Sequence, residues 1–168
     1  MPKIIHNLEQ KLIEEAKAQV LANGYGAVTI RSVAKACGVG VGTVYNYFSS
    51  KEELLASYLL ADWKRCVDAI NAVSAYSDQP EPVVRCIYDH LVAYAERHKA
   101  VFRDEAAASG FAVSAGSYHP MLRDQLAAPL RKFCKDDFAA RFIAEALLTW
   151  TVAGAELSQI RGMIERLF

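Results

Sequence analysis

The chain contains 168 residues, of which 53% are hydrophobic and 23% are charged, and its acidic and basic residues balance to a net charge of zero. Such a composition is typical of a globular protein with a sizeable core and excludes a disordered chain. No stretch reaches the roughly 18 uncharged apolar residues of a membrane span. Residues 1–10 lack the hydrophobic run of a secretory signal, so we expect a cytoplasmic protein without a membrane partner.

Charge is distributed unevenly along the chain. Residues 1–51 hold six Lys or Arg against three acidic residues, a balance of +3 that leaves −3 for the remainder. A mildly basic N-terminal segment suits a nucleic-acid-binding module, although +3 is weak electrostatic support by itself. The four cysteines form no C-x-x-C pair, which argues against zinc and favours small buried thiols, with redox sensing as the alternative. They are Cys37, Cys66, Cys86 and Cys134.

Apolar periodicity predicts two helices at the start of the chain. The first covers about residues 7–23 and ends near Gly24. Its inward positions are Leu12, Ile13, Ala16 and Val20. The second covers Ile30–Cys37, with the Thr29 hydroxyl as its N-cap. Gly38 can adopt the positive φ that ends a helix, so a sharp turn is expected immediately after it.

A further short helix fits Val41–Tyr47, directly after that turn. Val44 and Phe48 share its inward face, because they are four residues apart. The positions pointing elsewhere are Thr43, Tyr45, Asn46 and Tyr47. Two short helices joined by a tight glycine turn predict a helix-turn-helix, with the outward residues on its second helix.

The segment from Ser50 to Glu53 reads S-x-x-E, a capping box that opens a long fourth helix at Lys51. An apolar stripe continues along this helix for about five turns, which predicts a buried face and a connector to the rest of the chain. The stripe consists of Leu55, Leu59, Trp63, Cys66, Ile70 and Val73.

The run from Ile13 to Leu55 resembles the N-terminal DNA-binding domain of TetR-family transcriptional regulators. The likeness covers roughly residues 8–60, and its specific core, G-T-x-Y-x-Y-F-x-S-K-E-E-L, begins at Gly42. The resemblance implies DNA contacts at Thr29, Arg31, Thr43, Tyr45, Tyr47 and Lys51. It also implies a small-molecule pocket in the remaining helices and a homodimer formed through a four-helix bundle of the last two helices.

The second helix of a helix-turn-helix lies in the major groove, where its first turn meets base edges. By position, the residues able to reach bases are Val41, Gly42, Tyr45 and Asn46. Val41 suits a thymine methyl, Asn46 suits adenine, and Gly42 permits close backbone approach. Residues placed for phosphate contacts are Thr43, Tyr47 and Lys51, while Arg31 could contact bases or phosphates. Packing of Tyr45 or Tyr47 within the head is the alternative for either tyrosine.

Gly40 and Val41 depart from the pattern of many relatives, which have a polar N-cap and a basic residue at these positions. Their replacement removes a helix cap and a positive charge from the expected DNA-facing surface. Lower non-specific affinity for DNA is therefore expected.

Helical patterns continue to the end of the chain. One helix begins near Pro82, with Val84, Ile87, Leu91 and Tyr94 on one face. A shorter helix is expected over Lys99–Ala108, and a mobile loop over Ser109–Ser117. The helical pattern resumes over His119–Cys134, where Pro129 implies either a kink or a late helix start. One last long helix, Asp137–Arg161, is apolar nearly all round and must be covered on two sides, by the core of a monomer or by a second copy.

A ligand pocket in the body would need aromatic and polar lining residues. The candidates are Trp63, Cys86, His90, Tyr94, Phe102, Phe111 and Trp150. Core packing is the stronger reading for each aromatic, and the histidines are not spaced as metal ligands. The sequence contains no G-x-S-x-G nucleophile motif, no glycine-rich phosphate loop and no H-E-x-x-H zinc motif. Neither an enzyme nor a cofactor is therefore expected.

The sequence therefore predicts an all-α protein. It consists of a three-helix DNA-binding head over residues 1–50, joined by the long fourth helix to a helical ligand-binding and dimerisation body over residues 51–168. The expected function is a transcriptional regulator, a repressor, which binds a palindromic operator in double-stranded DNA and responds to a small apolar or amphipathic effector. The alternative is a helical ligand-binding or interaction protein that keeps the head but has lost specific DNA binding.

Overall fold

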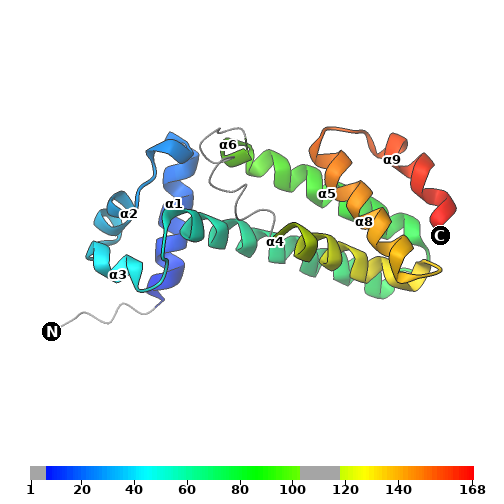
Figure 1. Cartoon of the computed structure of the whole chain (residues 1–168), viewed down its shortest axis with the longest axis horizontal. Helices are drawn as coiled ribbons and strands as arrows, with labels where there is room; N and C mark the ends of the chain where they lie inside the picture. The colour runs from blue at the N-terminus through cyan, green and yellow to red at the C-terminus, as the bar shows by residue number, and fades with distance from the viewer. Residues whose placement is uncertain (1–6, 103–117) are drawn as a thin grey trace. The chain divides into compact units, whose positions relative to one another are not determined.

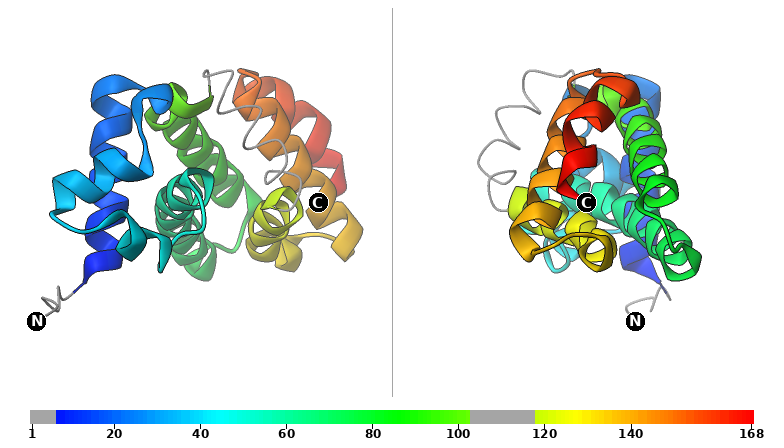
Figure 2. Two further views of the ribbon diagram at one scale, coloured as in Figure 1. Left: turned by 60° about the vertical axis from the view of Figure 1, so that its left-hand side comes forward. Right: turned by 90° about the vertical axis from the view of Figure 1, so that its right-hand side faces the viewer.

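The computed structural model describes residues 7–102 and 118–168. Within those ranges the chain folds into helices and contains no strand, which confirms the all-α prediction (Figures 1 and 2). Residues 118–127 are also helical. The elements are α1 (Leu8–Asn23), η1 (Tyr25–Ala27), α2 (Ile30–Cys37), α3 (Val41–Tyr45), α4 (Lys51–Tyr76), α5 (Pro80–Arg97), α6 (Lys99–Phe102), η2 (Ala128–Phe133), α8 (Asp137–Val152), α9 (Leu157–Ile164) and η3 (Glu165–Leu167).

The described chain forms two compact units. The head unit contains residues 7–62 and 98–102, and the body unit contains residues 63–97 and 118–168. Helix α4 contributes residues to both units. The division by function at residues 50 and 51 stays a prediction. No helix in the described ranges combines the length and the apolar composition that a membrane span requires.

The head unit is built around one hydrophobic core. Helix α1 packs against α2, and α2 packs against α3 (Figure 1). The four inward positions predicted for α1 are all buried, as are Val44 and Phe48 around α3. Val101 of α6 belongs to the same core, which places α6 within the head unit.

The turn chemistry of the head matches its sequence. The Thr29 hydroxyl accepts a hydrogen bond from the Ser32 N–H at 2.9 Å and caps α2, as predicted. Gly38 adopts φ 69°, and the following Val39 N–H donates to the Ala34 carbonyl at 3.0 Å, so the helix closes with a left-handed glycine. The predicted helix-turn-helix is therefore present.

Helix α4 begins at Lys51 and carries most of the predicted stripe inward. Leu55 and Leu59 are buried in the head unit, whereas Trp63 and Ile70 are buried in the body unit. The prediction for Val73 was wrong, because its side chain is 36% exposed. The adjacent Ser74 is buried instead, where its hydroxyl donates to the Pro129 carbonyl at 3.0 Å.

In the body unit, α5 and α8 pack side by side, and η2 packs against both (Figure 2). Of the four residues predicted to share one face of α5, Val84, Ile87 and Leu91 are buried, and Tyr94 is half-buried. Pro129 interrupts the preceding helix as expected, since α-helix gives way there to the 3₁₀-helix η2. The predicted helix Lys99–Ala108 is described only as α6, and the rest of it, with the predicted loop 109–117, lies outside the described residues.

The predicted single helix Asp137–Arg161 was wrong. It is divided into α8 and α9 at Gly154, which adopts φ 89°. The Ala155 N–H donates to the Trp150 carbonyl at 2.9 Å, which closes α8, and a capping box between Glu156 and Gln159 opens α9. The apolar pattern runs across the boundary between the two helices and therefore hid it. The local signals for the boundary were Gly154 and the E-x-x-Q segment that follows.

Candidate nucleic-acid interface

Helix α3 presents an exposed face. Tyr45 is 53% exposed and Tyr47 is 45% exposed, so neither ring is packed into the head core. Gly42 and Asn46 are exposed as well, and Thr43 is half-buried. Because Val44 and Phe48 anchor the opposite face, the predicted outward residues point away from the core.

The N-terminus of α2 lies beside this exposed face. Predicted DNA-contacting residues from α2, α3 and the start of α4 together line one shallow, open hollow within the head unit. They are Thr29, Arg31, Val41, Tyr45 and Lys51. The remaining four predicted residues, Gly42, Thr43, Asn46 and Tyr47, belong to α3 and the turn that follows it, outside the lining of the hollow.

Lys51 is held by an intramolecular contact. Its Nζ atom donates to the Tyr25 carbonyl at 2.7 Å and lies 3.9 Å from the centre of the Tyr25 ring. The Tyr25 hydroxyl in turn donates to Glu52 at 3.2 Å. Hydrogen bonding by the backbone at the start of α4 is the main reason that the pKa of Glu52 lies below its usual value. These contacts fix the start of α4 against η1, at one edge of the hollow.

The start of α4 carries the predicted capping box in a modified form. The Ser50 hydroxyl accepts the Glu53 N–H at 3.1 Å, as expected. The Glu53 carboxylate, however, accepts the Ser49 N–H at 2.6 Å, one residue before the expected partner. The Ser49 side chain and backbone both donate to this carboxylate, which lowers the pKa of Glu53.

The surface is only weakly cationic. Residues 38–49, which include all of α3, contain no charged side chain. Positive charge comes from neighbouring elements, with Arg31 and Lys35 exposed on α2. Gly40 caps α3 without a side-chain hydrogen bond. Contacts to DNA from α3 itself would therefore be made by neutral groups.

The predicted ligand-binding residues do not form one cluster. Trp63 is 3% exposed, donates to Gln125 at 2.7 Å and packs edge-on against Tyr94, with ring centres 5.5 Å apart. Cys86 and His90 form a second pair, with 3.5 Å between the sulfur and Nδ1. Burial raises the pKa of the Cys86 thiol, which disfavours a reactive thiolate.

The other three predicted ligand-binding residues lie elsewhere. Phe102 is 48% exposed and belongs to the head unit. Trp150 is 58% exposed on α8. Phe111 lies outside the described residues. Among the described residues, no group of His, Cys, Asp and Glu side chains is arranged to hold a metal ion.

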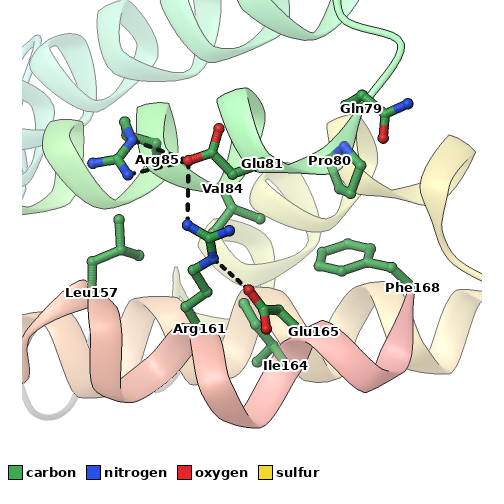
Figure 3. Close-up of a pocket in the computed structure, with 10 residues that line it drawn as sticks. All are labelled: Gln79, Pro80, Glu81, Val84, Arg85, Leu157, Arg161, Ile164, Glu165 and Phe168. Carbon is green, nitrogen blue, oxygen red and sulfur yellow. Dashed lines mark hydrogen bonds and ion pairs between the residues drawn. The ribbon is translucent and has the colours of Figure 1, made fainter.

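A cleft lies between the start of α5 and the segment formed by α9 and η3 (Figure 3). Its volume is about 190 Å³, and sequence reasoning missed it. Its apolar lining includes Val84, Ile164 and Phe168. Its polar side is an ion-pair network, in which Arg161 lies 3.5 Å from Glu81 and 2.5 Å from Glu165. Glu81 and Arg161 are 80 residues apart in sequence (161 − 81), so no local pattern could have indicated their contact.

A second hollow of about 410 Å³ runs along α8 and α9 and is mostly apolar. Its lining includes the exposed side chains Phe142, Trp150 and Met163. Trp150 thus belongs to an open apolar groove and not to an enclosed pocket. We call this surface the α8–α9 groove.

A buried polar chain lies in the head unit. His98 Nδ1 is 2.7 Å from the Tyr58 hydroxyl, and His98 Nε2 is 2.8 Å from a carboxylate oxygen of Asp62. All three residues are at most 3% exposed. His98 is separated from these partners by 36 and 40 residues, so its role was not visible in the sequence.

Comparison with known proteins finds relatives of the segment that contains the helix-turn-helix. The family model for bacterial regulatory proteins of the tetR family matches residues 12–58. Over 56 residues the chain is 39% identical to the HTH-type transcriptional repressor KstR of Rhodococcus jostii (strain RHA1), an alignment that covers 33% of this chain and 26% of that protein. The chain thus spans about a quarter of the length of this curated relative.

Two solved structures share the fold over nearly the whole chain. One is the TetR family repressor AlkX from Dietzia sp. strain DQ12-45-1b, with a TM-score of 0.68, 19% identity and 93% of each chain covered. The other is superantigen PfiT, with a TM-score of 0.60, 17% identity and 96% of each chain covered. At these identities the likeness concerns the fold. The chain therefore carries a tetR-type segment at residues 12–58, inside a fold that it shares with a TetR family repressor.

Proposed function

We propose that this protein is a DNA-binding transcriptional regulator, acting as a repressor, whose affinity for its operator is changed by a small molecule. One observation carries the proposal. Thr29, Arg31, Val41, Tyr45 and Lys51, from three different elements, line a single hollow beside the exposed face of α3. Convergence of polar, aromatic and cationic groups around a short exposed helix is what insertion into a major groove requires.

The residues of this surface divide into two groups by their chemistry. Val41, Gly42, Tyr45 and Asn46 are exposed on or beside α3 and are assigned to base edges. Thr43, Tyr47 and Lys51 are assigned to phosphates, and Arg31 to either. Thr29 is the N-cap of α2, and it is also assigned a phosphate contact because it is exposed. Lys51 would reach a phosphate only by giving up or sharing its contact with the Tyr25 carbonyl.

A homodimer formed through the last two helices is part of the proposal. Phe142, Trp150 and Met163 are between 52% and 78% exposed, and all three line the α8–α9 groove. Apolar groups gathered in this way lose contact with water when a second copy covers them. A two-fold dimer predicts a palindromic operator, whose half-sites lie about 34 Å apart on one face of the duplex.

The effector is proposed to be a small apolar or amphipathic molecule bound in the body unit. The Trp63–Tyr94 contact and the cleft shown in Figure 3 are its candidate sites, because each combines apolar surface with polar groups. A ligand regulates DNA binding only by preferring one conformation of the dimer over another. The change in the free energy of operator binding that the ligand causes would therefore be set by the difference in its binding free energy between the two conformations.

The second candidate is a helical ligand-binding or interaction protein that has lost specific DNA binding. The uncharged surface of α3, with Gly40 and Val41 where a polar cap and a basic residue are common, favours this alternative. The fold itself does not decide, since it is shared by a repressor and by a superantigen.

A gel-shift titration of the full chain distinguishes the two candidates. The probes are duplexes from beside the protein's own gene, tested from low to physiological salt, with a scrambled duplex of equal length as the control. The regulator proposal expects a discrete complex with one fragment, at least tenfold tighter than with the scrambled duplex. Absence of any shift at low salt, with or without candidate ligands, favours the second candidate.

A further inference from the structure

The surface of α3 that would face DNA is chemically unusual. From Gly38 to Ser49 it carries no Lys, Arg, Asp or Glu. In the major groove, guanine is read chiefly by the paired donors of Arg or Lys, and cytosine is read by the acceptors of Asp or Glu. Residues 38–49 therefore lack the side chains that most often recognise a G·C base pair.

The groups that are present suit A·T base pairs. Asn46 is exposed just after α3, and its amide offers the donor and acceptor that match adenine N7 and N6. Val41 is 37% exposed at the first position of α3, and its methyl groups suit contact with the thymine C5-methyl. Tyr45, 53% exposed, adds an aromatic ring and lines the hollow together with Val41, whereas Asn46 lies outside that lining.

Space around α3 allows the close approach that these short side chains need. Apart from its chain neighbours and the backbone of its own helix, a Cβ added at Gly42 would meet no heavy atom within 4 Å, so the protein surface there is open. Val41 and Asn46 can reach base edges only if the backbone of α3 lies deep in the groove, and an exposed glycine between them permits this.

Two cationic groups border the same hollow, and one of them, the Lys51 ammonium, is held by the Tyr25 carbonyl at 2.7 Å. The other is the guanidinium of Arg31. Arg31 is exposed near the N-terminus of α2 and lines the hollow together with Val41 and Tyr45. Because Arg31 belongs to α2, its side chain lies at the edge of the surface that α3 presents. A guanine contact is therefore available at that edge and not under α3 itself.

We infer that the operator half-site is A·T-rich at the base pairs beneath α3, where Val41 recognises a thymine methyl and Asn46 an adenine, with any guanine contact confined to the edge that Arg31 borders. This inference rests on the proposed function, since it concerns the same surface. It adds the class of DNA sequence that the surface selects.

The first experiment selects duplexes from a randomised pool with the full-length, unmodified protein at low salt. The expected result is an enriched half-site with an A·T core and, where guanine occurs, guanine at one edge. Each core thymine of the selected duplex is then replaced by uracil, which removes only the C5-methyl group. One of these replacements is expected to weaken binding about fivefold.

Two exposed variants then assign the contacts. In Val41→Ala the penalty for uracil should shrink, because the two Cγ methyl groups that reach the thymine methyl are removed. In Asn46→Asp the side chain keeps its shape but can only accept, so the preference at one position should change from adenine to cytosine by about tenfold. Asn71→Asp, exposed on α4, is the matched control and should leave the preference unchanged.

The possible outcomes separate this inference from the proposed function. A selected half-site with a G·C core, or a duplex indifferent to every uracil replacement, overturns the inference and leaves the regulator proposal standing. Failure to enrich any duplex at low salt overturns both. Retention of adenine preference in Asn46→Asp, with a normal melting temperature, removes Asn46 from base recognition and contradicts its assignment.

Discussion

The Nε2 atom of His98 lies 2.8 Å from a carboxylate oxygen of Asp62, and the two side chains are 0% and 3% exposed. His98 is also the residue between α5 and α6, where its carbonyl accepts the Val101 N–H at 2.9 Å. The same residue thus starts α6 through its backbone and binds α4 through its ring. The position of α6 against the head core depends on this side chain.

Replacement of His98 by Ala should lower the free energy of unfolding by about 3 kcal/mol, because it removes one partner of a buried hydrogen-bonded pair. Urea denaturation at fixed protein concentration measures the change. His119→Ala is the control. His119 and Glu145 also make a contact, at 2.9 Å, but their side chains are 46% and 41% exposed, so its loss should cost little. Equal losses in the two variants would contradict the structural role of His98.

Replacement of Gly154 by Ala should lower the free energy of unfolding by about 1–2 kcal/mol, because φ 89° places an added side chain in an unfavourable backbone region. Gly162→Ala is the matched control within α9. There the same change should raise the free energy of unfolding by about 0.5–1 kcal/mol through helix propensity. The opposite signs make the pair informative, and thermal or urea unfolding of both variants would reveal them.

Introduction of a charge into the α8–α9 groove should prevent dimer formation. Phe142→Glu places a carboxylate in the apolar lining, so association would bury an unpaired charge. Sedimentation velocity at micromolar concentration should show a dimer for the unmodified chain and a monomer for the variant. Leu21→Glu, at a 55% exposed position on α1, should remain dimeric. A monomeric unmodified chain would refute the dimer proposal.

Addition of a cation to α3 should raise non-specific DNA affinity. Val41→Lys supplies a charge where residues 38–49 have none, so one additional phosphate contact becomes available. The slope of the logarithm of the binding constant against the logarithm of salt concentration should become steeper by about 0.9. Fluorescence anisotropy with a random-sequence duplex measures this slope. Ala72→Lys, exposed on α4, should leave it unchanged.

Acid should destabilise the head partly through Glu53. Hydrogen bonds from Ser49 lower the pKa of Glu53 in the folded chain below its unfolded value. The stabilisation by Glu53 is therefore complete above the unfolded pKa of about 4.3 and is lost as the pH falls through the lower folded pKa. Glu53→Gln should reduce the dependence of unfolding free energy on pH between about 5 and 3. An unchanged pH profile in urea denaturation would argue against this contribution.

Local signals made the head predictable. The Thr29 cap, the left-handed Gly38 and the inward pair Val44 and Phe48 each involve residues a few positions apart, so their spacing carried the information. The same reasoning failed where an apolar pattern ran across a break, at Gly154, because periodicity alone does not register the end of one helix and the start of another.

Long-range contacts could not be predicted. Nothing near Asp62 in sequence indicates His98, and nothing near Glu81 indicates Arg161. Lys51 shows the same limit within the candidate site, because its spacing suggested a phosphate contact while its observed partner is the Tyr25 carbonyl. Sequence spacing located the exposed helix α3, whereas the partners of individual side chains depend on the packed chain.

Gly154 also determines where the end of the chain can go. Had α8 continued straight, Ile164 would have been carried about 17 Å along the helix axis beyond Ala153, at 1.5 Å for each of eleven residues. The chain instead turns at the glycine, and Ile160 and Ile164 are 4% and 1% exposed in the body core. The backbone angle at Gly154 thus allows the apolar side chains of α9 to be buried against the body unit, where a straight helix would have left them exposed.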